Sequence, residues 1–362
     1  MKAHSFIYLI IYSCFIMSVS LQAQEHFADR YNVSYITMDD GLPHNFIDDI
    51  YKDTRGFLWI STAGGGLSRY DGYEFIHFNP NTPHSKLKSN FIHNVYEDRF
   101  HRLWIVSERG TDIIDLSTLQ SVIPNDPKGL LPRFINHPTY IVILDSQGCI
   151  WLQCDNALHR ITFDAEGGID TLSTLDLPEQ DEPDLILKDI DEDGKIWTGI
   201  NGTIYKITPT PQGQLEKSSI SEQLTFWPGI YFKDMIAKEN EVWIATHIGL
   251  FRYNKSNNTR KLYENNQNDP HSLSQNYLTN LAITDDKQLI AGTLRGANIY
   301  NPITDNFERL THSSTSNSLL NSNFINCIRV DGQHIWFGTE SGGINKLTPK
   351  RSLSITDGNV VR

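Results

Sequence analysis

Short apolar runs recur along the chain, and each is followed by a turn and then, in most cases, by a tryptophan. The runs lack strict alternation and are rich in β-branched residues, which is typical of strands buried on both faces. They cover 46–51, 91–96, 140–144, 185–190, 230–236, 277–283 and 324–330. Asp and Gly stand at fixed offsets in the turns, as in Asp53-Thr54-Arg55-Gly56, and this combination is typical of hairpins. No segment of ten or more residues shows a convincing 3.6-residue apolar period, so the pattern predicts an all-β protein.

The tryptophans set the length of the repeat at about 46 residues. They are spaced 45, 47, 46 and 46 residues apart, and Ile290 and Trp336 continue the series that begins with Trp59, Trp104, Trp151, Trp197 and Trp243. Four short strands in about 40–50 residues, repeated, form one blade of a β-propeller. The sequence therefore predicts a seven-bladed β-propeller of four-stranded blades over residues 31–350. Large aromatic residues at one repeat phase are normally core, so we expect the tryptophans to pack between neighbouring blades.

The two ends of the repeat array predict how the ring closes. Residues 31–36 precede the first unit in the same way that 75–78 precede the second. We therefore predict that this segment is the outer strand of blade seven and closes the ring without an open sheet edge. Residues 351–362 resemble the entry to a further, truncated repeat, and we expect the natural polypeptide to continue past Arg362.

The first 23 residues have the features of a secretory signal. A short basic start is followed by an uncharged, mostly apolar run over 6–21, and Ala23 offers a small-residue cleavage site. The run is short for a membrane span, so a retained anchor is the weaker alternative. We expect cleavage after Ala23 and a periplasmic location. The three cysteines that remain, Cys149, Cys154 and Cys327, are an odd number, and we expect small buried core residues rather than a disulfide framework.

Charge and spacing exclude several classes of partner. The chain has 43 acidic and 31 basic side chains, a net charge of −12, and no cluster of Lys and Arg, which argues against nucleic-acid binding. Thirteen histidines show no metal-ligand spacing. The acidic turn over 189–194 imitates a calcium loop, but its twelfth position is Ile200 instead of glutamate. We therefore expect no metal, no cofactor and no catalytic residue motif.

Units one and seven carry a motif that extends the prediction beyond fold. The stretch 41–47, the Trp59 strand over 56–62 and Leu67-Ser68-Arg69-Tyr70-Asp71-Gly72 resemble the two-component regulator propeller repeat. The resemblance implies the periplasmic sensor region of a hybrid two-component system in a polysaccharide-degrading bacterium. It also implies a second propeller, a β-sandwich, a membrane helix and a histidine kinase, with receiver and DNA-binding domains in many members. Those parts are not in this sequence, so any membrane contact would come through downstream segments.

We expect a ligand on the propeller face where the loops between strands two and three and between blades gather around the channel. Four units share Leu-x-x-Asn-aromatic-Ile/Leu at this entry, and we expect its asparagines to bond loop backbone: Asn45, Asn90, Asn276 and Asn323. Units three to five lack the motif. Their loops are free to specialise, so we place the ligand nearer that arc.

The candidate ligand-binding residues are those that do not repeat in the loops between strands two and three. They are Glu108, Arg109, Asp155, Asn156, His247, Arg295 and Glu340. Arg109 and Arg295 can hold a carboxylate or sulfate of an acidic sugar bidentately, with solvated loop arginines as the alternative. Trp227 is off the repeat and can stack on a sugar ring or pack within its loop.

These features predict an extracytoplasmic ligand-sensing module of a hybrid two-component signal transduction system, with an oligosaccharide as its ligand. We do not expect this chain by itself to be an enzyme. Two alternatives stay open. One is a propeller lyase or glycosidase, and the other is a docking module that contacts a second propeller or a second copy of itself.

Overall fold

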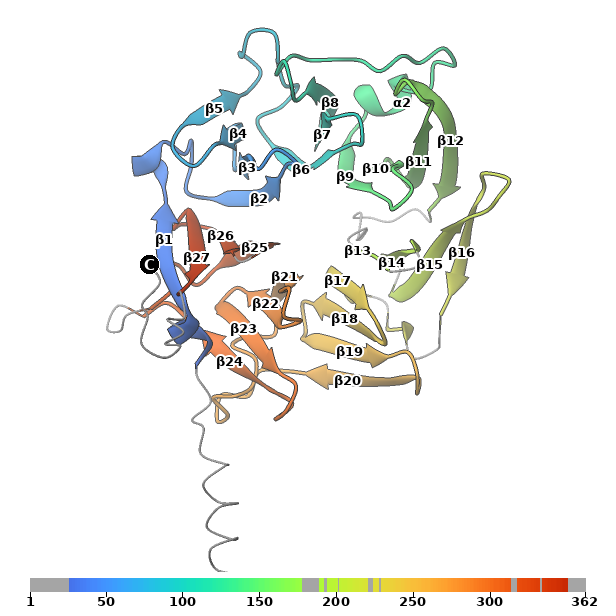
Figure 1. The fold of residues 1–362 in the computed structure, drawn as a ribbon. Helices are drawn as coiled ribbons and strands as arrows, with labels where there is room; N and C mark the ends of the chain where they lie inside the picture. Colours follow the sequence, from blue (N-terminus) through green and yellow to red (C-terminus); the bar gives the residue numbers. More distant parts are fainter. Residues whose placement is uncertain are drawn as a thin grey trace, which may run out of the picture.

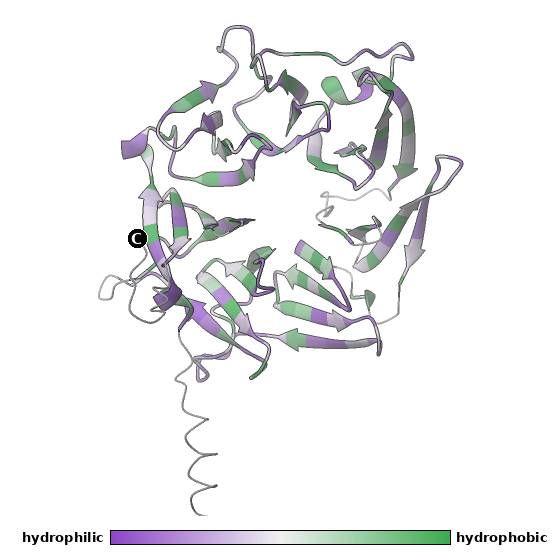
Figure 2. Cartoon of the chain, in the orientation of Figure 1, coloured by the Kyte–Doolittle hydropathy of each residue, from purple (hydrophilic) through white to green (hydrophobic). Residues whose placement is uncertain are grey.

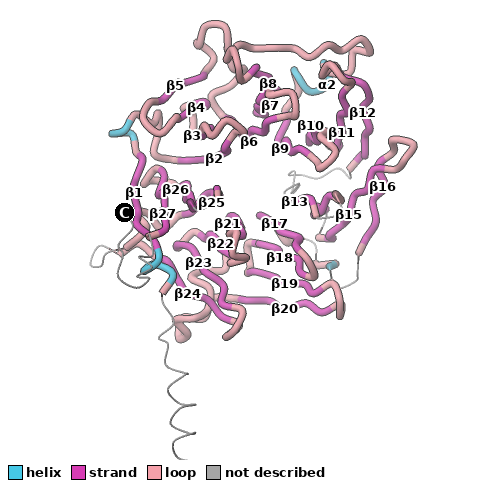
Figure 3. The backbone as a smooth tube through the Cα atoms, viewed as in Figure 1, coloured by secondary structure: helices cyan, strands magenta, loops and turns pink. Residues whose placement is uncertain are grey.

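The computed structural model describes residues 26–350, apart from 178–188, 192–193, 201, 221–223, 228, 314–317 and 333. The predicted signal segment 1–23 and the predicted further repeat 351–362 lie outside the described residues. Seven antiparallel sheets stand radially around a central channel (Figure 1). Short helical turns occur at η1 (Phe27–Arg30), η2 (Met38–Asp40) and α2 (Pro132–Ile135) (Figure 3). The predicted seven-bladed, all-β propeller is confirmed.

In blades one to six the strands follow chain order from the centre of the ring outwards (Figure 1). Blade one is β2 (Ile47–Lys52), β3 (Leu58–Thr62), β4 (Gly66–Tyr70) and β5 (Phe75–Phe78). Blade two is β6 (Ile92–Glu97), β7 (Arg102–Ser107) and β8 (Gly110–Asp115), and blade three is β9 (Thr139–Leu144), β10 (Ile150–Cys154), β11 (Ala157–Phe163) and β12 (Ile169–Asp176). Blade four is β13 (Asp189–Ile190), β14 (Ile196–Ile200), β15 (Thr203–Pro209) and β16 (Leu215–Ser219).

Blades five and six have the same layout. Blade five is β17 (Phe232–Lys238), β18 (Glu241–Thr246), β19 (Leu250–Asn254) and β20 (Thr259–Tyr263). Blade six is β21 (Leu278–Ile283), β22 (Leu289–Thr293), β23 (Gly296–Asn301) and β24 (Asn306–Leu310). Blade two differs in its outer position, where residues 120–122 pair with β8 through one bridge, Ile114–Ser121, instead of a strand.

Blade seven combines both ends of the described chain. β25 (Ile325–Asp331), β26 (His334–Thr339) and β27 (Ile344–Pro349) form its inner three strands, and β1 (Tyr31–Ile36) is the fourth. β1 pairs antiparallel with β27 from Tyr31↔Pro349 to Ile36↔Ile344, so the predicted closure is confirmed. Phe27 extends the closure: its side chain is buried between blades six and seven, and its backbone N–H donates to both Glu308 carboxylate oxygens at 3.0 Å.

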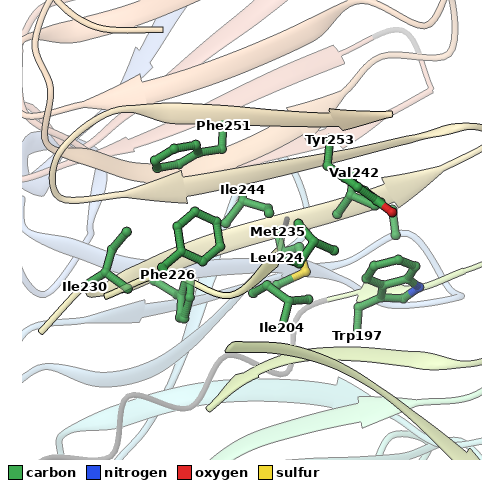
Figure 4. Packing of buried hydrophobic residues seen from close by; sticks show 12 residues of the cluster. Trp197, Ile204, Leu224, Phe226, Ile230, Met235, Val242, Ile244, Phe251 and Tyr253 are labelled. Carbon is green, nitrogen blue, oxygen red and sulfur yellow. The ribbon is translucent and has the colours of Figure 1, made fainter. Parts of the chain in front are cut away.

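The apolar core is divided into seven clusters, one at each interface between neighbouring blades. Trp197 of blade four, for example, packs with Met235 and Val242 of blade five (Figure 4). Trp59 packs into blade two in the same way, and Trp336 of blade seven packs against Ile47 of blade one. Apolar residues are accordingly spread over all the blades instead of one central core (Figure 2). The predicted packing role of the repeating tryptophans is confirmed.

In five blades an acidic side chain in or just after the first turn binds the indole of its own blade. The Trp Nε1–H donates to the carboxylate of the Asp six residues earlier in four blades, at 2.8 Å in Asp53–Trp59, Asp98–Trp104 and Asp191–Trp197 and at 2.9 Å in Asp145–Trp151. Blade five uses a different residue, Glu241, whose carboxylate lies 3.1 Å from Trp243 Nε1. The other oxygen of the Asp accepts backbone N–H groups of the turn, as at Asp98 from Phe100 and Arg102. The acidic turn over 189–194, as far as it is described, is therefore a hairpin that serves this bond.

A basic residue of the third strand lies over the same indole. The cation is Arg160 over Trp151, Lys206 over Trp197, Arg252 over Trp243 and Lys346 over Trp336. In blades three to five this cation also pairs with the turn acid. We call the acid, the indole and the cation together the blade clasp. Because a buried carboxylate needs charged and hydrogen-bonded partners, the clasp explains why these three residue types recur at fixed offsets.

The three cysteines are free and buried, as predicted. Burial raises the pKa of the Cys149 and Cys154 thiols to about 11 and that of Cys327 to about 12. The thiols therefore stay protonated at neutral pH and belong to the core.

Candidate functional site

A β-bulge interrupts the innermost strand at the same position in six blades. The pairing with the second strand skips one residue in each case: Asp48, His93, Tyr140, Lys233, Thr279 and Asn326. A bulge leaves its extra residue unpaired and re-aims the side chain. Four of these residues, Asp48, His93, Tyr140 and Asn326, line a central channel of about 540 Å³.

The residue after the bulge joins neighbouring blades. Asn94 accepts the Val142 N–H of blade three at 2.9 Å and donates to the Asp49 carboxylate of blade one at 3.2 Å. Asn280 repeats this arrangement, since it accepts the Ile328 N–H at 2.7 Å and donates to Asp234 at 2.5 Å. Because the residue after the bulge makes the contacts between blades, the bulged residue itself is free to differ from blade to blade.

The channel carries titratable groups whose charged forms are disfavoured. Burial, with the adjacent Asp49 charge as a second cause, raises the pKa of Asp48 to about 6. The surroundings of His93 lower its pKa, chiefly by desolvation, and its ring lies 5.5 Å from that of Tyr140. Asp48 is therefore protonated to a larger extent than a free carboxyl as the pH falls towards 6, and burial favours the neutral imidazole of His93.

The raised pKa of Asp48 predicts a pH dependence of stability. The folded state binds a proton more tightly than the unfolded state, whose Asp pKa is about 3.9. The stabilising contribution is therefore full below about pH 4 and is lost as the pH rises through about 6. We expect Asp48→Asn to remove this loss, so that the variant gains stability relative to the wild type between pH 4 and 7. Urea unfolding at several pH values measures the effect, and parallel curves for the two proteins would contradict it.

Aromatic residues surround one end of the channel, where the inner strands begin. Phe46, Phe91, Tyr231, Tyr277 and Phe324 each stand two residues before a bulge, and we call this set the rim. Phe91 is 58% exposed and Tyr231 42%, so both rings are accessible from solvent. The Lys233 ammonium lies 5.0 Å from the Tyr277 ring centre. The rim thus combines accessible aromatic faces with polar groups at the channel entrance.

The loops between strands two and three dock directly on the rim. The N–H groups of Ala63, His247, Leu294 and Glu340 donate to the carbonyl oxygens of Phe46, Tyr231, Tyr277 and Phe324, respectively, at 3.1–3.4 Å. The predicted face is therefore the face of the rim.

The motif asparagines have the structural role that the sequence predicts in three of four cases. Asn45, Asn276 and Asn323 accept backbone N–H groups of Met38, Asn265 and His312 at 2.9, 2.6 and 2.7 Å. For Asn90 the described bond is through its backbone, which accepts the Gly66 N–H of blade one at 2.9 Å.

The structure brings some of the predicted ligand-binding residues to the rim. His247 packs its ring 5.0 Å from that of Tyr231 and accepts the Tyr231 N–H at 3.0 Å. Glu340 is exposed next to Phe324, and Arg295 is exposed one residue after Leu294. In blade two, Arg109 is 72% exposed beside Glu108, which accepts the Ser89 hydroxyl at 2.5 Å.

Two other predicted regions lie apart from these contacts. Asp155 and Asn156 belong to a separate pocket of about 320 Å³ in blade three, shared with Arg133, His137 and His159. Burial and Arg133 lower the pKa of His159 to about 4. Trp227 is 52% exposed, and its backbone lies against Gly202 in the loop of blade four. The rim residues come from blades one, two, five, six and seven. We predicted a ligand near blades three to five, so the rim and the predicted region share only blade five.

Sequence reasoning missed the rim aromatics and the bulged residues. The aromatic position is part of the repeated Leu-x-x-Asn-aromatic-Ile/Leu motif. Our interpretation of that motif assigned a structural role to its asparagine and no role to its aromatic residue. The position two residues after the aromatic residue carried the signal for the bulged residues. It is Asp, His, Lys, Thr or Asn, although the residues on either side of it are alike from unit to unit.

Among the residues that the structure describes, none of the helices has the length and apolarity that a membrane span requires. In the same residues, no group of three or more His, Cys, Asp and Glu side chains is placed to hold a metal ion.

Comparisons with known proteins support the fold and the repeat. Residues 41–64 match the family model of the two component regulator propeller, so the resemblance seen in the sequence is confirmed over that unit. Among curated protein sequences, none matches this chain.

Solved structures with the same fold include extracellular domains of bacterial signalling systems and a lyase. The extracellular domain assigned to a one component system of B. thetaiotaomicron is 21% identical, with a TM-score of 0.64 over 90% of this chain and 40% of that chain. One assigned to a hybrid two component system of the same organism is 20% identical, with a TM-score of 0.65 over 88% and 42%. Virginiamycin B lyase from Staphylococcus aureus is 15% identical, with a TM-score of 0.59 over 89% and 99%. The chain thus spans about 40% of the length of the two extracellular domains.

Proposed function

We propose that this chain is an extracytoplasmic sensing propeller of a two-component type of signalling system and that it binds an oligosaccharide at the rim. The observation that carries the proposal is the rim itself. Five blades place an aromatic residue at the same channel entrance, while the bulged polar residue beside it differs in each blade. A repeated scaffold with one varying polar position is suited to recognising an asymmetric ligand that has both apolar faces and hydroxyl groups.

The chemistry of the rim favours a sugar over a purely apolar ligand. Ligand sites combine apolar and aromatic walls with a few placed polar groups. Here Phe91 and Tyr231 offer exposed rings, and Asp48, His93 and Tyr140 lie deeper in the channel. Sugar C–H faces pack on aromatic rings, and sugar hydroxyls exchange hydrogen bonds with such side chains.

The signalling role rests on the family match over 41–64 and on the likeness to extracellular sensor domains. These relatives also support an extracytoplasmic location and a non-enzymatic propeller. Because the chain spans about 40% of those domains, the reporting step would belong to other parts of such a system.

We expect Phe91→Ala and Tyr231→Ala each to weaken oligosaccharide binding about tenfold. Loss of one aromatic contact removes roughly 1–1.5 kcal/mol, and 1.4 kcal/mol corresponds to a factor of ten. Calorimetry against a panel of neutral and acidic oligosaccharides identifies the ligand for the wild type, and the same ligand is then titrated into each variant.

Tyr73→Ala is the matched control, because Tyr73 is 91% exposed and lies in the β4–β5 hairpin, at the end of the blade away from the rim. It should bind like the wild type. Equal affinity of all three variants for a ligand of the wild type would place binding elsewhere and refute the rim as the site.

A lyase is the second candidate, and one observation favours it. The fold match spans 99% of virginiamycin B lyase, and the channel of this chain holds His93 beside Tyr140. Product analysis of the calorimetry mixtures separates the two functions. Product that forms with the wild type and is absent with His93→Ala would favour the enzyme, whereas saturable binding without turnover favours the sensor.

A further inference from the structure

Blade seven has the indole and the cation of the blade clasp but lacks its acid. The position six residues before Trp336 is Val330, where four other blades have Asp. The position two residues before it is His334, where blade five has Glu241. Blade seven therefore has a basic side chain at the place from which blade five supplies its carboxylate.

The consequence is visible in the hydrogen bonds. Trp336 Nε1 is buried and has no hydrogen-bond partner, and Trp336 itself is 4% exposed. The Lys346 ammonium lies 4.8 Å from the ring centre, as the clasp cations do in other blades, but has no acidic partner among the described residues. The His334 ring centre lies 6.1 Å from that of Trp336. The indole N–H and the Lys346 ammonium are thus donors without a carboxylate partner, and the neighbouring His334 imidazole can donate through one ring nitrogen.

These three side chains line a groove of about 460 Å³ along the seam between blades seven and one. Tyr35 and Tyr70 also line it, and the groove adjoins the channel end opposite the rim at Lys52 and Asp331. A volume of this size accommodates a small ligand. The rim residues do not line the groove, so it is a second site.

The three carboxylates that line the groove already have partners other than Trp336 and Lys346. Asp331 pairs with Lys52 at 2.6 Å. Asp40 accepts the Thr37 N–H at 2.9 Å, and Asp71 accepts the N–H groups of Tyr73 and Glu74 at 2.8 Å. The groove therefore has donors at Trp336 that no carboxylate accepts from, despite its acidic margin. Burial, with the Lys346 charge as a second cause, lowers the pKa of His334.

We propose that this groove is a binding site for a small organic carboxylate of sugar-acid size, whose carboxylate occupies the position that the turn acid holds in the other blades. Its oxygens accept the Trp336 indole N–H and pair with Lys346, with His334 as a further donor. Because the indole nitrogen is buried, the side chains over it have to shift when the ligand enters. Charge-assisted bonds to a desolvated N–H favour an anion over a neutral sugar.

The test observes the Trp336 indole directly. Tryptophan labelled with ¹⁵N at Nε1 gives one resonance for each indole, and Trp336→Phe assigns the one of interest. We expect sodium glucuronate to shift this resonance saturably, while glucose and matched sodium chloride leave it unchanged. Absence of a saturable shift, or the same shift with glucose, would overturn the proposal.

A second variant tests the same idea without a ligand. His334→Glu copies blade five, so its carboxylate should bind Trp336 and Lys346, abolish the glucuronate response and raise Tm by about 1–3 °C. His271→Glu is the control, since it makes the same change at an exposed histidine between blades five and six. A His334→Glu protein that matches this control in Tm and keeps the glucuronate response would refute the missing-acid explanation. A third outcome is a wild type that dimerises and does not respond to glucuronate, together with a monomeric His334→Glu variant. In that case a second copy of the chain supplies the carboxylate, and the proposal of a small ligand is overturned.

Discussion

Asp98→Ala should lower the free energy of unfolding by about 3–5 kcal/mol, the range for breaking a buried charged pair. The Asp98 side chain is fully buried and accepts four hydrogen bonds: from the backbone of Phe100 and Arg102, the Arg102 guanidinium and the Trp104 indole, at 2.7–3.1 Å. Alanine leaves the Arg102 charge and the indole N–H buried without their acceptor. Chemical denaturation monitored by tryptophan fluorescence measures the change.

Two comparisons make this prediction specific to the bonds of Asp98 with the Trp104 indole and Arg102. Asp98→Asn should be nearly as destabilising, because its amide NH₂ would face the indole N–H or the guanidinium, donor against donor. Asp71→Ala should cost much less, because Asp71 caps an exposed turn through Tyr73 and Glu74 and touches no indole. Equal effects of Asp71→Ala and Asp98→Ala would show that turn formation alone explains why the Asp–Trp offset recurs in this chain. The bonds of Asp98 to the indole and to Arg102 would then contribute nothing.

Removal of residues 26–36 should abolish the cooperative unfolding of the monomer. This segment supplies β1, the buried side chain of Phe27 and that of Ile36, which packs with Leu42 and Trp336. Burial of each large apolar side chain contributes roughly 1.5–3 kcal/mol. Loss of these two alone removes about 3–6 kcal/mol from a typical total of about 5–15 kcal/mol. Thermal unfolding and size-exclusion chromatography of a chain beginning at Thr37 measure the effect.

Loss of β1 also exposes the edge of β27. The unpaired backbone groups of this edge can then pair with a strand of another molecule. We therefore expect association of the truncated chain. A peptide of residues 26–36 added in trans should restore the monomer, and a scrambled peptide of the same composition should not. A truncated chain that stays monomeric and keeps its wild-type Tm would show that ring closure does not depend on this strand.

The blades were predictable because their contacts are local. Consecutive strands pair through short turns within about 46 residues, so the alternation of apolar runs, Asp-Gly turns and tryptophans records each hairpin directly. The closing strand was predictable for a related reason, since residues 31–36 resemble an outer strand that has no unit of its own. In blade two the analogous outer segment reduces to the bridge Ile114–Ser121, a difference that the pattern does not show.

Only part of the blade clasp could be predicted from the sequence. Asp53 and Trp59 each have an evident local role, one in the turn and one in packing, but the bond between them needs the hairpin register that places their side chains together. The same limit applies to blade seven. Val330 and His334 look like ordinary variation until the structure shows that Trp336 Nε1 has lost its acceptor.

The sequence by itself determined the number, order and closure of the blades and the face on which the loops gather, because these follow from the period of short-range pairing. Only the tertiary structure decided which side chains share a site. A bulge is a shift of one residue in register, which no apolar run reveals, and it alone aims Asp48 and His93 into the channel. Radial packing then makes neighbours of residues about 46 positions apart and separates Asp155 from His247, although both occupy the same loop phase.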